Sequence, residues 1–405
     1  MRKEYLEEHM KKIKIMIALS LVTVMIFGCK GSGGNPTVDI GSEGSLVVEN
    51  DKSTQEVTDA TTEEITTEEI TTEEPTTIDL QEFDFTMCFA GDILLAEGEI
   101  TTNNLDASEN GLQGCISKEY LDIMNAADYT CVNNEFTYSD RGEAMSGKAW
   151  TFRANPERVK YLKEMGVDLA LLANNHVYDY GKDAMLDTLT TLKDADIDYF
   201  GAGANLEEAM KPVYVNLDGK TVAFVAASRA EKHKMTPQAT EDSPGILRCY
   251  DPTLFIEVIK EARANADFVV ACVHWGTERS TVLEDAQLDT ARQYIDAGAD
   301  MIVGSHSHCL QGMEYYNGKP IIYSLGNFWF DEYYEDTMLV NIRIHGDING
   351  SNVEVSVVPG MQDDGKTVIF TDEAEKERVY KHLEDISVNI EIDENGVVHS
   401  KEVAE

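Results

Sequence analysis

The first clear pattern along the chain is a series of short apolar runs, separated by stretches that read as helices. Continuous apolar runs of this length are typical of strands buried on both faces of a sheet. The predicted strands are 85–90, 129–132, 167–173, 222–227, 268–273 and 301–303, and the predicted helices are 155–164, 181–195, 253–264 and 284–297. Strands that alternate with helices predict an α/β fold with a largely parallel core sheet.

The pattern changes after about residue 330. Segments 337–344 and 353–358 alternate apolar and polar residues, and Asn349-Gly350 between them is a turn signal, so we expect an antiparallel hairpin there. Segment 372–386 reads as a helix. We therefore expect a main domain over residues 83–360 and a peripheral C-terminal extension over 361–405.

The N-terminal residues have the pattern of a targeting signal. Lysines precede an apolar run over residues 15–27, which is too short to span a membrane comfortably and is typical of a secretory signal. Gly28-Cys29 then resembles the end of a bacterial lipoprotein signal. We expect a signal peptide over 1–28, a lipid on Cys29 and a location on the extracytoplasmic face of the cell membrane. A plain signal peptide with a chance cysteine and an uncleaved anchor remain as alternatives.

Residues 29–82 are rich in Gly, Ser, Thr and Glu, and three near-identical pentads follow one another from Thr61. Such a biased segment cannot bury enough apolar surface to offset the entropy lost on ordering. Its excess of acids also makes it repel itself. We expect a disordered acidic tether that holds the following domain away from the membrane.

The charge of the whole chain excludes one class of function. It has 74 acidic and 33 basic side chains, a formal net charge of -41, which argues against nucleic-acid binding because that needs clustered Lys and Arg. The hydrophobic content of 42% is ordinary, so the chain as a whole is not disordered. None of its seven cysteines forms a CxxC pair, which argues against zinc ribbons and thioredoxin-like chemistry.

The polar residues of the α/β region gather where the predicted strands end. In open α/β sheets, the carboxyl ends of the strands are the edge at which ligands bind. Five strand ends of metal-ligand type on one edge are hard to explain by structure alone, so we expect a functional site there. The residues are Asp92, Glu135 after Asn133-Asn134, Asn175-His176 after Asn174, His274, and His306 with His308.

These residue types predict a metal centre. His306 and His308 are two positions apart, so in an extended segment both imidazoles would face one side and could serve two ions. Carboxylates with neutral imidazoles suit Mn, Zn or Fe. Two ions about 3.5–4 Å apart would activate a water and hold a phosphoryl oxygen.

Several segments together carry a family resemblance, and they occur in the family's order between about residues 85 and 330. They are Ala90-Gly91-Asp92, Asn133-Asn134-Glu135, Leu172-Ala173-Asn174-Asn175-His176, His274-Trp275-Gly276-Thr277-Glu278, Gly304-Ser305-His306-Ser307-His308 with Gln311, and Tyr323-Ser324-Leu325-Gly326-Asn327-Phe328. The chain resembles the CapA family, which is named for poly-γ-glutamate capsule synthesis.

That family in turn resembles the calcineurin-like metallophosphoesterases, whose fold is two sheets sandwiched between helices. The resemblance implies a catalytic acid at His176. It also implies a divalent metal, as one or two ions, held by Asp92, Glu135, Asn175, His274, His306 and His308. The chain departs from the pattern at Leu94, where a further His ligand is normal, and at Glu135, where Asp is normal.

Six more residues are candidates for substrate binding or for orienting these groups. Arg153 could hold a substrate carboxylate or phosphate, or be an interior arginine satisfied by loop carbonyls. Glu278 could be a base, a ligand or a partner that orients His274. We expect Asp179 to orient His176. The resemblance adds Gln311, Ser324 and Asn327 to this set.

Two classes of function remain open. The first is a metal-dependent hydrolase that acts on a phosphoester or an envelope polymer. The second is a non-catalytic, metal-bound component of a polymer export or tethering complex. The loss of a ligand at Leu94 favours the second, and the retained His176 favours the first. The expected partners are the membrane, through the lipid, and the machinery of capsule or poly-γ-glutamate synthesis and export.

Overall fold

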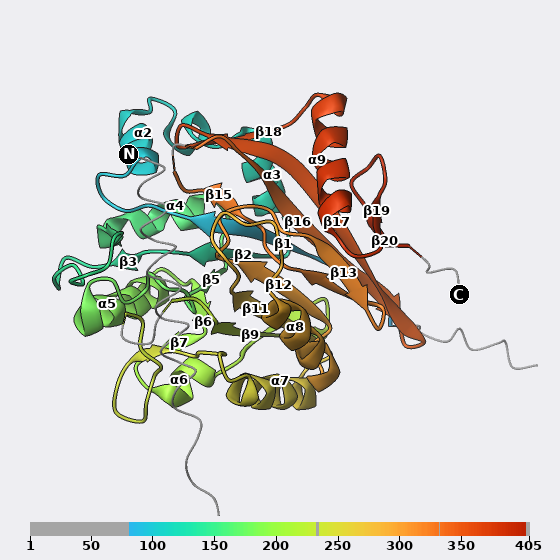
Figure 1. Ribbon diagram of the computed structural model, residues 1–405, viewed down its shortest axis with the longest axis horizontal. Helices are drawn as coiled ribbons and strands as arrows, with labels where there is room; N and C mark the ends of the chain where they lie inside the picture. Colours follow the sequence, from blue (N-terminus) through green and yellow to red (C-terminus); the bar gives the residue numbers. More distant parts are fainter. Residues whose placement is uncertain (1–80, 232–234, 332, 402–405) are drawn as a thin grey trace, which may run out of the picture. The chain divides into compact units, whose positions relative to one another are not determined.

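The described strands form two large sheets that share a hydrophobic layer, with helices on their outer faces (Figure 1). The computed structural model describes residues 81–231, 235–331 and 333–401. The predicted signal peptide, Cys29 and nearly all of the predicted tether lie outside these ranges.

The first sheet has eight strands among the described residues, in the order β18-β17-β16-β1-β2-β5-β6, and β15 also pairs with β1. Strands β1, β2, β5 and β6 are parallel, whereas β16, β17 and β18 pair antiparallel. The bounds are β1 (Phe83–Ile93), β2 (Tyr129–Asn134), β5 (Leu169–Leu171), β6 (Asp198–Phe200), β15 (Asn327–Trp329), β16 (Glu335–Asp347), β17 (Gly350–Asp363) and β18 (Lys366–Ile369).

The second sheet has six strands in the described ranges, in the order β13-β14-β12-β11-β9-β8. Its four central strands are parallel, and both edge strands are antiparallel. The bounds are β8 (Val213–Leu217), β9 (Lys220–Ser228), β11 (Phe268–His274), β12 (Met301–Ser305), β13 (Met313–Tyr316) and β14 (Lys319–Ile322). Three small pairs are β3 (Thr137–Tyr138) with β4 (Arg153–Ala154), β7 (Ala202–Gly203) with β10 (Gly245–Ile246), and β19 (Ile390–Ile392) with β20 (Val398–Ser400).

The apolar runs are continuous because each central strand is covered on both faces. In β1, Met87 faces the layer between the sheets, whereas Cys88 faces the layer under the helices. In β11, Val270 and Val269 divide in the same way. Successive side chains of a strand point to opposite faces, so burial on both sides removes the polar half of the pattern. The two-sheet α/β sandwich that the family resemblance implies is confirmed, and the parallel strands predicted from the sequence divide between its two mixed sheets.

Helices cover the two outer faces. Apolar residues of α2, α3, α4 and α5 pack on the first sheet, and those of α7 and α8 pack on the second. Among the described helices, none is long and apolar enough to cross a membrane. The bounds are α2 (Ile100–Ala107), α3 (Lys118–Ala126), α4 (Val159–Glu164), α5 (Gly181–Asp194), α6 (Leu206–Met210), α7 (Thr253–Asn265), α8 (Asp285–Ala297) and α9 (Glu373–Ile386), with short 3-10 helices at Gly111–Gly114 and Pro156–Arg158.

The C-terminal segment continues the sandwich. The predicted hairpin is present as β16 and β17, although its two turn residues are Ile348 and Asn349, because Gly350 already pairs with Asp347. The expected boundary at residue 360 is wrong, since β17 runs through it to Asp363. Nor is the segment beyond it peripheral. The predicted helix is α9, and its Val379, Tyr380 and Leu383 join the layer between the sheets.

Candidate metal centre

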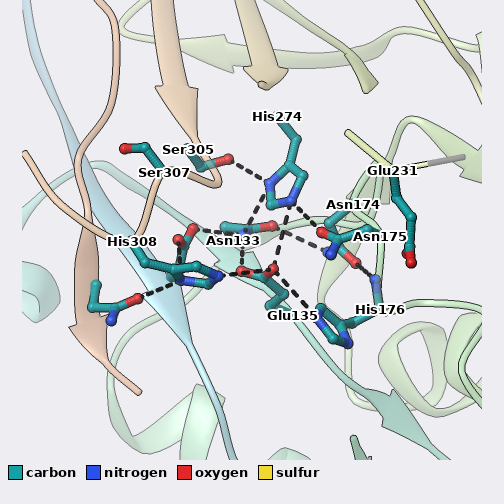
Figure 2. A network of polar contacts seen from close by, with 12 residues as sticks. Asn133, Glu135, Asn174, Asn175, His176, Glu231, His274, Ser305, Ser307 and His308 are labelled. Carbon is teal, nitrogen blue, oxygen red and sulfur yellow. Dashed lines mark hydrogen bonds and ion pairs between the residues drawn. The ribbon is translucent and has the colours of Figure 1, made fainter. Parts of the chain in front are cut away.

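The six candidate ligands meet at one edge of the sandwich, where parallel strands of both sheets end. Figure 2 shows four of them, Glu135, Asn175, His274 and His308. From the first sheet, Asp92 lies near the end of β1, Glu135 directly follows β2, and Asn175 lies in the loop after β5. From the second sheet, His274 ends β11, and His306 and His308 follow β12. The structure thus brings together all six residues that the sequence predicts as ligands.

Glu135 lies at the centre of this cluster. Its Oε1 atom is 3.5 Å from His274 Nε2 and 4.0 Å from His308 Nε2. Two sets of ligand atoms, each within 4.8 Å of one another, could hold an ion, and Glu135 belongs to both. One set is Glu135, His306 and His308, and the other is Asp92, Glu135 and His274. A shared carboxylate suits either one ion or a neighbouring pair.

Three buried polar atoms of the cluster have no hydrogen-bond partner in the described part of the chain, and this bears on whether the residues can bind a cation. Among the described residues, Asp92 Oδ2, Glu135 Oε1 and His306 Nδ1 are buried and have no hydrogen-bond partner. Buried polar atoms in native proteins almost always have partners, because each unpaired one costs about 1–3 kcal/mol. All three atoms have lone pairs and belong to groups that bind Mn, Zn and Fe. The donor set therefore fits a divalent cation.

The electrostatics point the same way. Burial raises the pKa of Asp92, and the nearby Glu135 carboxylate raises it further. Burial also opposes ionisation of Glu135, but His274 and His308 outweigh it, and the pKa of Glu135 is lowered. Burial lowers the pKa of His306 well below its ordinary value, which keeps this imidazole neutral, the form that binds metal.

The carboxylates beside His308 favour its cationic form. Burial alone would lower its pKa, but Glu135 and Asp92 raise it to about 10. Its Nδ1 is 3.3 Å from Asp92 Oδ2 and 2.8 Å from Asn327 Oδ1. A positive charge is therefore favoured between these carboxylates, and a metal ion can supply it in place of the proton.

The backbone around the two histidines is not extended, as the sequence argument assumed. His306 has a φ of 95° and His308 a φ of 54°, a region that non-glycine residues rarely adopt. The Ser307 hydroxyl fixes this bend by donating to the carbonyl of Cys309 at 2.7 Å, and its oxygen lies 2.8 Å from Ser324 Oγ, whose hydroxyl can donate to it. Strained backbone of this kind is characteristic of functional sites.

Neutral polar side chains orient the ligands. Asn133 Nδ2 donates to Asp92 Oδ1 at 2.7 Å and to Glu135 Oε2 at 3.0 Å, so one amide ties both carboxylates together. His274 Nδ1 is 2.9 Å from Ser305 Oγ, and its Nε2 is 2.7 Å from Asn175 Oδ1. Such contacts fix the orientation of each ligand.

His176 lies beside the centre rather than in it. Its Nε2 is 4.0 Å from Glu135 Oε1, and it belongs to neither set of ligand atoms. Its Nδ1 is 2.7 Å from Asp179 Oδ2, which is the contact expected of an orienting partner. Buried Lys148 in turn donates to Asp179 Oδ1 at 2.7 Å, pairs with Glu231 at 2.9 Å and also donates to the carbonyl of Asn175.

Some predicted residues lie outside the cluster. Arg153 donates to the carbonyls of Arg141 and Gly142 at 3.2 and 3.1 Å and lines a separate hollow of about 520 Å³. Glu278 is exposed, so its expected contact with His274 is wrong, and Ser305 holds that imidazole instead. Gln311 is buried against Gln287 at 2.8 Å. Its Nε2 also donates to the carbonyl of Ser280 at 2.9 Å, so Gln311 supports the loop after β11 rather than the metal ligands.

Sequence reasoning missed Lys148 and the roles of Asn133 and Ser305. Lys148 comes from the loop between β3 and β4, which has no regular pattern. Asn133 and Ser305 do carry a signal, since each adjoins a candidate ligand within its motif. Leu94, at the position of the absent histidine, is buried in the hydrophobic layer under the helices.

Comparison with known proteins identifies the family. Sequence relatives include the PGA biosynthesis protein CapA of Bacillus subtilis, 40% identical over 213 residues that cover 52% of this chain and 55% of the relative. The capsule biosynthesis protein CapA of Bacillus anthracis is 38% identical over 237 residues that cover 57% and 56%. The chain thus spans about half the length of the curated relatives it matches.

Among solved structures, a putative 5'-nucleotidase from Staphylococcus aureus is similar at a TM-score of 0.41 and 14% identity, over 74% of this chain and 58% of that one. The family described as bacterial capsule synthesis protein PGA_cap matches residues 86–332. This match takes in more than half of the chain and includes all six candidate ligands, so the chain belongs to the bacterial capsule synthesis protein PGA_cap family.

Proposed function

We propose that the chain is a metal-dependent hydrolase that acts in the synthesis or export of a capsule polymer of the poly-γ-glutamate type. The observation that carries the proposal is the pair of ligand sets that share Glu135, with the His176–Asp179 pair beside them. The polymer and the machinery are taken from the names of the relatives, which are capsule and PGA biosynthesis proteins.

The chain's own residues supply the parts of a hydrolytic site. A bound divalent cation would polarise a substrate oxygen and lower the pKa of a water. The contact with Asp179 fixes Nδ1 of His176 and leaves Nε2 on the side of Glu135 and the cluster. A proton on Nε2 can pass to the leaving group, the role of a general acid. Lys148 forms a direct ion pair with Asp179 at 2.7 Å and so helps to hold the carboxylate in place beside His176. Mn, Zn and Fe all suit the donor set.

A second function is favoured by one feature. Leu94 takes the position of an expected histidine ligand and is part of the apolar layer, so one ion would have fewer ligands. This supports a non-catalytic, metal-bound component of a polymer export or tethering complex. The two proposals differ in whether a protein with its metal turns over substrate.

We also propose that the chain is held on the extracytoplasmic face of the membrane by a lipid on Cys29. The motivation is the apolar run that ends at Gly28-Cys29. Cys29→Ala should move the protein out of the membrane fraction or leave it unprocessed. A variant that fractionates and migrates like the wild type would contradict lipidation of Cys29.

Metal analysis followed by substrate assays tests the main proposal. The full chain, loaded with Mn, Zn or Fe, should hold one or two ions and hydrolyse a phosphodiester, a phosphomonoester or a γ-glutamyl oligomer. His306→Ala should lose both metal and turnover, because it removes a neutral ligand. His399→Ala, on an exposed histidine, should keep both. Unchanged metal in His306→Ala contradicts the metal centre, and full metal without turnover selects the second function.

A further inference from the structure

Two arginines lie against one exposed tyrosine near the metal centre. The guanidinium of Arg229 is 4.9 Å from the centroid of the Tyr250 ring, and that of Arg248 is 5.2 Å from the same centroid. The Tyr250 side chain is 53% exposed. Stacking on an aromatic ring holds a guanidinium in a fixed plane and leaves its edge free for a partner.

Both arginines are tied to the half of the cluster that contains His274 and Asn175. Arg229 directly follows β9, and its backbone N–H donates to the carbonyl of His274 at 2.8 Å. Arg248 Nη1 donates to the carbonyl of Thr236 at 2.6 Å, and Thr236 Oγ1 donates to the carbonyl of Asn175 at 2.8 Å. These contacts connect both arginines to the backbone of two candidate ligands.

The Arg248 guanidinium has no direct contact with a carboxylate among the described residues, although the charge of Glu231 acts on it from nearby. Arg229 pairs with Glu284 at 2.9 Å. Among the described residues, Arg248 forms no ion pair, and its guanidinium donates to the main-chain carbonyls of Thr236 and Glu231. By contrast, Arg279, which stacks on Tyr333 in the same way, pairs with Asp331 and Glu335.

The positive charge of this arginine pair can attract an anion. Two like charges that share one ring repel each other, and in this chain acids outnumber bases by 74 to 33, so carboxylate partners are plentiful. An arginine left without one beside a reactive centre has open N–H donors. Their fork geometry matches a carboxylate or a phosphate.

We infer that Arg229, Arg248 and Tyr250 form an anion-binding site, separate from the metal ligands, for carboxylate groups of an anionic polymer chain. The identity of that chain rests on the proposed function, whereas the anion preference rests on the arginine pair. The two arginines would hold carboxylates that lie next to the reacting bond of the polymer. This also gives a polyanion a local attraction to a protein whose formal charge is -41.

The test measures binding of a labelled γ-glutamate decamer to the metal-loaded full chain by fluorescence anisotropy at low salt. Arg248→Gln and Arg229→Gln should each weaken binding about tenfold, the loss of charge-assisted hydrogen bonds. Tyr250→Leu should weaken it less, because both charges remain. A glutamine decamer should not bind. Arg343→Gln, which removes an exposed arginine paired with Asp84, is the matched control and should bind like the wild type.

Three outcomes overturn the inference. The first is that the wild type fails to bind the glutamate decamer. The second is that the arginine variants bind it as the wild type does. The third is that a phosphate-bearing chain binds in place of the glutamate decamer. Circular dichroism and metal content verify that each variant is folded. His306→Ala separates this inference from the proposed function, because it should lose metal and turnover yet retain arginine-dependent binding. Intact turnover without decamer binding rejects the arginine site alone.

Discussion

Glu135 shows how one residue can serve two ligand sets. The resemblance places an aspartate here, and glutamate has one more methylene. Its Oε2 accepts from Asn133, which leaves Oε1 among the imidazoles of His274, His308 and His176. The longer side chain is thus anchored by one oxygen and offers the other to the cluster. A glutamate at this position in place of the aspartate can therefore still serve as a metal ligand.

At the same scale, a substitution of His176 distinguishes the hydrolysis step from metal binding. His176→Ala should lower the rate of hydrolysis by about 10²–10⁴, the usual contribution of a general acid. Metal content should stay at the wild-type level, because His176 belongs to neither ligand set. Elemental analysis and steady-state kinetics on one preparation measure both. A variant that loses its metal would make His176 a ligand, and one that keeps full activity would remove it from the chemistry.

The sequence predicts individual ligands well and their supporting residues poorly. Asp92 and His274 are predictable because polar residues that end apolar strands stand out, and the strand ends meet at one edge. Lys148 is not predictable, since it reaches Asp179 from 31 positions away through a loop. The role of Glu278 is not predictable either, since sequence proximity to His274 does not fix the direction of a loop side chain.

At the scale of the elements, most strands and helices follow from their patterns, whereas their partners do not. Strands β1 and β11 read alike, because both are buried on both faces. Nothing in an apolar run states which sheet it joins, so the pattern alone does not divide the strands between two sheets, and only the family resemblance implies that division. The boundary at residue 360 failed for a related reason. An amphipathic helix such as α9 looks the same whether it closes the core or lies on the surface.

The contact between β1 and β15 gives a prediction at this scale. A Cβ atom at Gly91 would lie 2.0 Å from the carbonyl oxygen of Gly326, the same oxygen that accepts from the backbone N–H of Asp92 at 2.9 Å. Gly91→Ala should therefore push the strands apart, cost about 1–3 kcal/mol and displace Asp92. Urea unfolding should show a lower midpoint, and elemental analysis should show less metal.

A substitution on the exposed face of α9 is the comparison for this variant. Glu377→Ala should change the free energy of unfolding by less than about 0.5 kcal/mol and leave metal content unchanged. If Gly91→Ala unfolds at the wild-type urea concentration and holds the same metal, the close approach of β1 to β15 does not position Asp92.

At the scale of the whole molecule, the metal centre joins the two sheets. Its ligands come from β1 and β2 on one side and from β11 and β12 on the other, so an ion bound there connects both halves of the sandwich. An unfolded chain cannot present these side chains together. Because the ion binds only the folded state, it stabilises that state by mass action.

Metal removal should therefore lower thermal stability. At an ion concentration about 100 times the dissociation constant, binding contributes about 2.7 kcal/mol, which corresponds to a rise in Tm of about 5 °C over chelated protein. The chain has 41 more acids than bases, and its surface can bind divalent ions without the cluster. His306→Ala, which keeps that surface, distinguishes the two sources and should show almost no rise. Equal rises in both proteins, measured by calorimetry with EDTA as reference, would assign the stabilisation to the surface.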